Sequence, residues 1–219
     1  MPAVFTALVT GSAHAQSSSA VRDSVELLDR LATEGLDAWR ETRLADRPTR
    51  YRIGRENGRS VLEAESFGGN SALWRRVDVP VSRTSVVSWR WKVARSLSTN
   101  RRERSRRGDD FAARLFVVFD APEGPWSGKA VCYVWAGLEP IGAAYRSPYS
   151  DDVAMIVVES GDARAGSWVT VRRNVVDDYR AAFGAAPETL SGIAIMVDTD
   201  NTESRARAWF EGLVVIRRP

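Results

Sequence analysis

Two apolar runs carry the polar side chains that are best suited to binding or catalysis. Asp110 and Arg114 are four positions apart in one run, so a strand places both on the same face. Asp198, Asp200 and Asn201 follow the end of another run. Carboxylate, amide and guanidinium groups can hold hydroxyl groups, and two carboxylates that face a sugar can cleave a glycosidic bond. These residues are therefore candidates for ligand binding or for carboxylate-based hydrolysis.

Aromatic side chains alternate with polar ones in two further segments. Trp89 and Trp91 flank Arg90, and Tyr133 and Trp135 share one face of a later strand. An aromatic ring can stack on the face of a sugar, so these four rings join the candidate ligand-binding set. The alternative is that they fill the core of a β-sandwich, where large aromatic residues are common. The sequence alone leaves both interpretations open.

The sequence does not supply the residues that most other catalytic mechanisms require. His14 is the only histidine, so a chain cleaved after residue 15 has no imidazole for a catalytic triad. Cys132 is the only cysteine, and its apolar surroundings predict a small buried side chain. The segment 124–130 resembles a phosphate-binding loop, but it is one residue short and lacks the closing Ser or Thr. We therefore expect no catalytic residues of the standard kinds.

The elements that must position these residues are mainly strands. Turn residues separate runs of period two, and Asn57 followed by Gly58 is typical of a hairpin turn. An amphipathic helix is expected over 20–34, and a short helix capped by Asn174 over 175–183. Many strands and few helices predict an all-β fold, a two-sheet antiparallel β-sandwich of jelly-roll type. About ten strands are expected, near 51–53, 61–65, 71–79, 84–93, 110–119, 129–136, 153–159, 167–173, 190–198 and 206–216.

The chain divides into three parts by composition. Residues 1–15 hold a short apolar stretch that ends in Ala-His-Ala, the pattern of a signal-peptide remnant. Residues 16–35 are assigned to the N-terminal helix, and 36–219 to a single β-sandwich domain. Export predicts a periplasmic or secreted protein. No later stretch reaches the ~20 apolar residues of a membrane span, so a membrane-spanning protein is not expected.

The basic charge is concentrated in one loop. The formal net charge is +3, and the five arginines between positions 101 and 107 exceed the single acid among them, Glu103, by four. The rest of the chain is therefore close to neutral, and no nucleic-acid partner is expected. The loop 95–108 is interpreted as a solvated loop. If it does bind, anionic polysaccharides or phospholipid headgroups are the expected partners.

Six segments together resemble a known bacterial family. In order, they are SWRWKV at 88–93, DDFAARLFVVF at 109–119, YVWA at 133–136, VVESG at 157–161, DYRAAFG at 178–184 and IAIMVDTDNT at 193–202. The pattern, over about 36–218, is similar to the domain-of-unknown-function family number three-thousand-and-forty-seven. This resemblance implies a small and usually exported protein, and it brings no established activity.

A shorter resemblance concerns a structural metal. Glu63-Ala64-Glu65, followed by a Gly-Gly-Asn turn, is similar to the first strand of jelly-roll carbohydrate-binding modules. In those modules, acids of the first strand and acids near the last strand hold a structural calcium ion. The resemblance implies that Glu63, Glu65 and Asp198 could hold such an ion here. No other cofactor is expected.

Three hypotheses follow for the function. The leading one is a non-catalytic periplasmic ligand-binding domain that recognises a glycan or a small anionic ligand. The first alternative is a glycoside hydrolase or metal-dependent hydrolase that uses Asp110, Asp198 and Asp200. The second alternative is a structural envelope protein that binds another protein through an exposed apolar patch. They differ in whether these acids meet in an open cleft.

Overall fold

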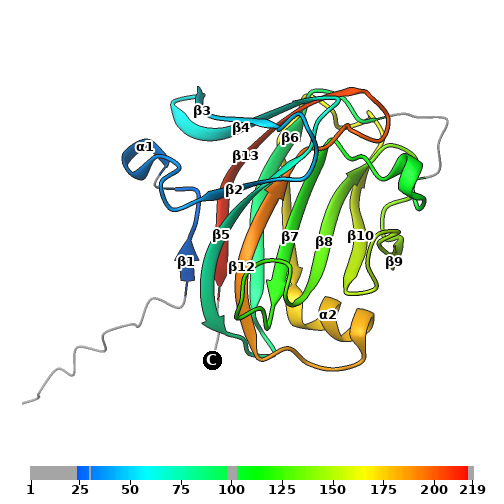
Figure 1. The fold of residues 1–219 in the computed structure, drawn as a ribbon. Coiled ribbons are helices and arrows are strands. Elements are labelled where there is room, and N and C mark those ends of the chain that lie inside the picture. The colour runs from blue at the N-terminus through cyan, green and yellow to red at the C-terminus, as the bar shows by residue number, and fades with distance from the viewer. Residues whose placement is uncertain (1–23, 30, 98–102, 217–219) are drawn as a thin grey trace, which may run out of the picture.

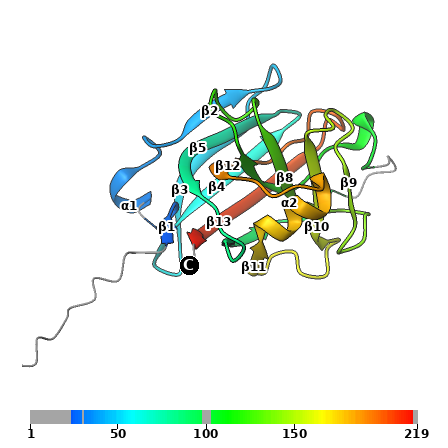
Figure 2. The same ribbon diagram turned by 90° about the horizontal axis from the view of Figure 1, so that it is seen from below.

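The protein is a sandwich of two β-sheets in the computed structural model, which describes residues 24–29, 31–97 and 103–216. Figures 1 and 2 show the two sheets packed face to face. Thirteen strands lie in the described residues, and the three additions to the expected set, β1, β2 and β9, have only three or four residues each. The all-β sandwich predicted from the sequence is confirmed.

Sheet A, the six-stranded sheet, has the order β11-β6-β13-β4-β3, and β1 pairs with β13. All its pairs are antiparallel, and β3 and β4 form the hairpin that turns at Asn57 and Gly58. The strands are β1 (Ser24–Glu26), β3 (Arg50–Glu56), β4 (Arg59–Phe67), β6 (Val86–Val93), β11 (Val169–Asn174) and β13 (Arg205–Ile216).

Sheet B, the seven-stranded sheet, has the order β2-β5-β12-β7-β8-β10-β9. One pair, β8 with β10, is parallel, which differs from the purely antiparallel expectation. The cause is the long connection 137–152, which carries the chain back to the start of β8 before β10 begins. The strands are β2 (Arg40–Arg43), β5 (Ser71–Pro80), β7 (Ala113–Phe119), β8 (Lys129–Ala136), β9 (Ala144–Arg146), β10 (Val153–Ser160) and β12 (Thr189–Met196).

The main core lies between the two sheets and is rich in aromatic rings. Alternate residues of each strand point inward, as a pleated strand requires. The Trp91 ring lies 5.4 Å from that of Trp89, 6.1 Å from that of Trp135 and 6.3 Å from that of Phe210, measured between centroids. Tyr133 packs 5.2 Å from Trp89. These rings join the sheets at the centre of the sandwich.

A second apolar cluster covers the outer face of sheet B. It includes Phe116 of β7, Cys132 of β8, Met155 of β10 and Met196 of β12. Strand β7 is therefore buried on both faces along its whole length, which explains why its sequence reads as continuous apolar residues. Cys132 has no exposed surface, as the sequence predicted, and burial raises the pKa of its thiol.

The N-terminal part differs from the helix predicted over 20–34. In the described residues, Ser24–Glu26 is strand β1, which pairs with β13, and only Leu31–Glu34 forms a helix, α1. The spacing of the leucines reflects burial and not a helix. Leu27, Leu28 and Leu31 all pack into the core between the sheets. The sandwich thus begins before residue 36. Residues 1–23, including the expected signal remnant, lie outside the described residues.

The second predicted helix is confirmed as α2 (Val175–Phe183). The Asn174 side chain accepts hydrogen bonds from the backbone N–H groups of Val176 and Asp177, and Gly184 ends the helix with a φ of 77°. It lies at one end of the sandwich, below β8 and β10 in Figure 1. No helix in the described part of the chain is long and apolar enough to cross a membrane.

The described end of the basic loop is anchored through an acid. Residues 98–102 lie outside the described residues, and Arg106–Gly108 forms a short 3-10 helix, η1. The buried Glu103 carboxylate accepts backbone hydrogen bonds from Gly137 (2.6 Å), Leu138 (3.1 Å) and Glu139 (2.7 Å). This part of the loop is therefore attached to the connection after β8, which also leads to the pocket described next.

Candidate functional site

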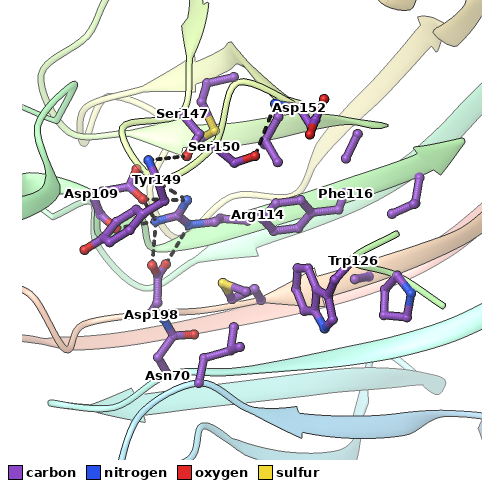
Figure 3. Close-up of a pocket in the computed structure, with 18 of the residues that line it drawn as sticks. Asn70, Asp109, Arg114, Phe116, Trp126, Ser147, Tyr149, Ser150, Asp152 and Asp198 are labelled. Carbon is purple, nitrogen blue, oxygen red and sulfur yellow. Dashed lines mark hydrogen bonds and ion pairs between the residues drawn. The ribbon is translucent and has the colours of Figure 1, made fainter. Parts of the chain in front are cut away.

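A pocket of about 430 Å³ opens on the outer face of sheet B (Figure 3). Strands β7, β8, β10 and β12 form its floor with the side chains that point away from the main core. The loops at 109, 125–128, 147–152 and 198–201 form its rim. The floor is apolar, and its residues include Phe116, Val118, Met155, Ala194 and Met196.

Two aromatic side chains on the rim are exposed. Trp126 is 54% exposed and Tyr149 is 52% exposed, unlike the rings of the main core. The loop that carries Trp126 passes very close to the end of β7. A Cβ atom at Gly128 would lie 2.1 Å from the carbonyl oxygen of Phe119, so only glycine allows this approach. The loop thereby holds an indole ring beside an apolar floor.

The polar end of the pocket is built around Arg114. Its Nε donates to Asp198 Oδ1 at 2.8 Å, and its Nη2 donates to Asp198 Oδ2 and to the carbonyl oxygen of Asp109. Nη2 also lies 3.3 Å from Asp109 Oδ2, and Nη1 lies 3.5 Å from both carboxylate oxygens. Figure 3 shows these residues at one end of the pocket and Phe116 and Trp126 toward the other. The pair register of β7 and β12, Arg114 opposite Met196, brings Asp198 into reach.

The three charges of this cluster are buried together. Burial raises the pKa of Asp198 to about 7, against the lowering effect of Arg114. Burial also raises the pKa of Asp109, which Arg114 again opposes. Burial alone would lower the pKa of Arg114, but Asp109 and Asp198 outweigh it and raise that pKa well above its ordinary value. Each buried charge is therefore stabilised by its partners, and removing any one of the three would destabilise the fold.

Asp110 holds the loop that follows β12. Its Oδ1 accepts from the backbone N–H (3.2 Å) and the Nδ2 (3.1 Å) of Asn201. Its Oδ2 accepts from the backbone N–H (2.7 Å) and the hydroxyl (2.5 Å) of Thr202. The Tyr149 hydroxyl in turn donates a hydrogen bond to Asn201 Oδ1 at 2.7 Å. Asp110 is thus a buried positioning residue of the pocket rim.

Replacing Asp110 with alanine is expected to lower the free energy of unfolding by about 1–3 kcal/mol, because four partly buried donor groups lose their acceptor. Hydrogen exchange of the amides at Asn201 and Thr202 should also become faster, since both donate to this carboxylate. Asp151→Ala, at an exposed position, is the matched control. Unchanged exchange at both amides in a folded Asp110→Ala variant would contradict the anchoring role.

Two oxygens near the polar end have no partner among the described residues. They are Oδ1 of Asp200 and Oδ1 of Asn70, and each atom is buried. Burial raises the pKa of Asp200, and the charge of Asp110 adds to the rise. The Asn70 side chain lies near Asp200 and opposes the rise in the pKa of that carboxyl. Each of these two oxygen atoms has almost no exposed surface, so both lie beneath the surface of the pocket.

The acids of the site are not arranged for a cation. Asp110, Asp198 and Asp200 each have an oxygen within 4.8 Å of the others. However, the oxygens of Asp110 and Asp198 already accept hydrogen bonds from the loop and from Arg114, and Ca²⁺ takes about six to eight oxygen ligands. Only Asp200 retains an unfilled oxygen of the three. The set fits a hydrogen-bonded cluster and does not fit a metal ion.

The calcium set implied by the shorter resemblance is not brought together. Glu63 and Glu65 alternate with the core residues Leu62 and Ala64, so they point to the outer face of sheet A. Asp198 faces the pocket on the opposite side of the sandwich. Glu63 instead accepts hydrogen bonds from Arg52 and Arg207. Those three acids cannot hold one ion.

The predicted aromatic ligand surface also needs correction. Trp89, Trp91, Tyr133 and Trp135 have no exposed surface and lie between the sheets. Alternation does place them on shared faces of their strands, but those faces are the inner ones, so these four rings are core residues with no surface for a ligand. Among the other predicted residues, Arg114, Asp198, Asp200 and Asn201 line the pocket, and Asp110 lies directly behind it.

Several lining residues were not predicted, and they come from loops. Trp126 and Tyr149 lie in turn-rich segments without periodicity, and Asn70 follows a Gly-Gly turn. The one available signal was a tryptophan inside the Gly- and Pro-containing segment 124–128, where an aromatic side chain has no strand to bury it. The sequence gives no comparable signal for Asp109. Its neighbour Asp110 is the residue that alternation places on the same face as Arg114.

Similar solved structures include carbohydrate-binding modules and an enzyme domain, all at low identity. A family 11 carbohydrate-binding module from Clostridium thermocellum, in complex with a β-1,3-1,4-mixed-linked tetrasaccharide, is 11% identical with a TM-score of 0.44, over 89% of this chain and 95% of that one. A non-crystalline cellulose specific module, CBM28, is 14% identical with a TM-score of 0.43, over 83% and 89%. The xyloglucanase domain of NopAA from Sinorhizobium fredii is 10% identical with a TM-score of 0.45, over 82% and 93%.

These likenesses concern the fold alone and do not indicate a ligand. No curated protein matches the sequence. The family suggested by the six sequence segments is found independently from the whole sequence. A family model described as "Protein of unknown function (DUF3047)" matches residues 37–214, so the chain belongs to this family.

Proposed function

We propose that this protein is a carbohydrate-binding domain whose ligand lies in the pocket on the outer face of sheet B. The observation that carries the proposal is the pocket's composition. It combines exposed aromatic rings and an apolar floor with fixed polar groups at one end. Its volume of about 430 Å³ is within the usual range for small-ligand sites.

A sugar ring matches both halves of this pocket. It has apolar C–H faces that stack on aromatic rings, and hydroxyl groups at its edges that donate and accept hydrogen bonds. Trp126 offers an exposed indole next to the floor. Ser147 and Ser150 accept from the backbone N–H groups of Tyr149 (3.2 Å) and Asp152 (3.1 Å), so their hydroxyl hydrogens remain available to a ligand.

The distribution of exposed apolar groups also favours this face. Seven large hydrophobic side chains are exposed in the described residues, and three of them, Leu44, Trp126 and Tyr149, line the pocket. An exposed apolar cluster rimmed by polar groups is typical of a binding site. A purely structural role would not require this combination in a concave site.

Binding without catalysis is the better match to the acids. A glycosidase needs one carboxyl as the acid and a second as the nucleophile or base. Here both oxygens of Asp198 accept from Arg114, and both oxygens of Asp110 accept from the loop at 201–202. Of the three candidate acids, Asp200 alone keeps an unfilled oxygen. Two of the three candidate acids are thus engaged within the protein, which suits ligand recognition better than either hydrolytic mechanism.

The test is a glycan array followed by calorimetry on the full chain and on Trp126→Ala. We expect Trp126→Ala to weaken binding of any uncharged glycan hit by about tenfold or more, because a central aromatic contact is lost. Phe67→Ala is the matched control, since Phe67 is 53% exposed and its strand, β4, belongs to sheet A. An array without hits for folded protein, or equal losses in both variants, would refute the proposal.

A further inference from the structure

The outer face of sheet A, here called the basic face, carries a surplus of positive charge. On β11, β6, β13, β4 and β3, the side chains that alternate with core residues point away from sheet B (Figure 2). At these outward positions eight side chains are basic and four are acidic. The arginines used below are Arg50, Arg52, Arg59, Arg90, Arg205 and Arg207. The near-neutral charge of the chain outside the basic loop therefore conceals a basic face.

The Glu63 carboxylate holds two arginines of the basic face. Its Oε2 accepts from Nε (2.9 Å) and Nη2 (2.8 Å) of Arg52 and from Nη2 of Arg207 (2.8 Å). The Arg207 guanidinium also lies 4.6 Å from the centre of the Trp209 ring. The side chains of Arg52 and Arg207 are 63% and 40% exposed, so each keeps N–H donors toward the solvent. One acid thus positions two cations and neutralises the charge of only one.

Glu211 holds a second pair of arginines in the same way. It forms an ion pair with Arg90, and its Oε1 lies 4.0 Å from Nη1 of Arg59. Arg90 lies 5.3 Å from the centre of the Trp168 ring, and the side chain of Arg59 is 72% exposed. Because carboxylates and rings restrict these side chains before a ligand arrives, binding to them costs less conformational entropy.

Two further arginines complete the array. Arg50 and Arg205 are exposed, and neither forms an ion pair within the described part of the chain. The strand register places Glu65 between Arg50 and Arg207, so this acid also faces two cations. Arginine stays charged at every ordinary pH, so the positive surplus of the basic face does not depend on titration.

We propose that the basic face binds a linear polysaccharide of uronic acids, as a second site separate from the pocket. The face already holds the carboxylates of Glu63 and Glu211 between pairs of arginines, and a uronic acid polymer presents further carboxylates at regular intervals. Outward side chains are about 7 Å apart along a strand, and neighbouring strands are about 5 Å apart. An extended polymer on this face therefore meets several fixed arginines at once.

Calorimetry with polygalacturonate tests this site on the full chain. The matched ligand is highly methyl-esterified polygalacturonate, which keeps the sugar backbone and loses most of the charge. We expect the unesterified polymer to bind about tenfold or more tightly in about 0.1 M salt, and to lose its binding near about 1 M salt, where exposed charges are screened. Single-stranded DNA and dextran sulfate, compared at equal charge, replace the carboxylates by phosphate or sulfate and should bind less tightly.

Charge reversal tests the residues. The double variant Arg50→Glu with Arg205→Glu removes the surplus of the basic face without breaking an ion pair, and it should weaken polygalacturonate binding by about tenfold or more. Arg50→Lys with Arg205→Lys keeps both charges and should retain most of the affinity. The matched control is Arg40→Glu with Arg43→Glu, which makes the same change in net charge at exposed positions of β2 in sheet B. It should bind as the parent protein does. Thermal unfolding verifies that all variants are folded.

The outcomes separate the basic face from the pocket. Equal affinity for the charged and the esterified polymer, no binding of polygalacturonate, or equal losses in the two reversal variants would overturn the site. Tighter binding of DNA or dextran sulfate would overturn the uronic acid assignment. Trp126→Ala should leave polygalacturonate binding unchanged, and a loss there would place this ligand in the pocket and refute binding at the basic face. Failure of uncharged glycans to bind would remove only the function proposed for the pocket.

Discussion

Replacing Arg114 with methionine is expected to lower the free energy of unfolding by about 3–5 kcal/mol, the usual cost of removing one partner from a buried ion pair. Methionine keeps the unbranched apolar part of the side chain and removes the guanidinium group, so the loss comes mainly from electrostatics and hydrogen bonds. Asp109 and Asp198 are both buried, at 4% and 1% exposed, and would lose the guanidinium that they share. Chemical denaturation of parent and variant measures the difference.

The pH dependence of this loss has a defined sign. Without Arg114, the influence that opposes the raised pKa of Asp198 and Asp109 is gone, so their carboxyls bind protons still more tightly in the folded state. A group with a raised pKa in the folded state stabilises the fold as the pH falls toward its unfolded value. The deficit of Arg114→Met should therefore shrink between neutral pH and about pH 4. A deficit that grows on acidification would contradict this account.

Two further variants isolate the buried cluster. Arg172→Met removes an exposed arginine of β11 and should change stability by only about 0.5 kcal/mol or less. Adding Asp198→Asn to Arg114→Met removes one of the two orphaned carboxylates. The double variant should therefore be more stable than Arg114→Met alone, because charges in contact do not act additively.

The faces of the strands were predictable, but not the direction in which each face points. Alternation correctly placed Tyr133 and Trp135 on one side, and Asp198 opposite Ile195 and Val197. In a sandwich, however, each sheet has one inner and one outer face, and period two cannot distinguish them when both are apolar. Sheet B is such a case, because Phe116 and Met155 make its outer face apolar as well.

Long-range placement explains the other errors. Glu63 and Asp198 are both outward-facing acids, but they belong to different sheets, and nothing in the local sequence assigns a strand to a sheet. The N-terminal leucines have helical spacing, yet pairing of β1 with β13 and burial of Leu27 and Leu28 outweigh helix propensity. The rim residue Trp126 lies in a loop, where periodicity gives no information at all.

The distinction between core aromatics and pocket aromatics leads to a second large effect. Trp91→Ala is expected to lower the free energy of unfolding by about 3–5 kcal/mol, the range for truncating a large buried aromatic side chain. Trp91 has no exposed surface and contacts the rings of Trp89, Trp135 and Phe210, so its removal leaves a cavity between the sheets. Trp91→Phe should cost clearly less, because the Nε1 of Trp91 has no hydrogen-bond partner to lose.

Trp126→Ala is the matched comparison, and it should show the opposite behaviour. Its side chain is 54% exposed on the pocket rim, so stability should stay within about 0.5 kcal/mol of the parent protein while glycan affinity falls. Denaturation and calorimetry on the same preparations measure both properties. If Trp91→Ala kept its stability and lost only binding, the four inner rings would be the ligand surface after all. Loss of stability in Trp91→Ala, with loss of binding in a stable Trp126→Ala, would instead assign recognition to the outer pocket.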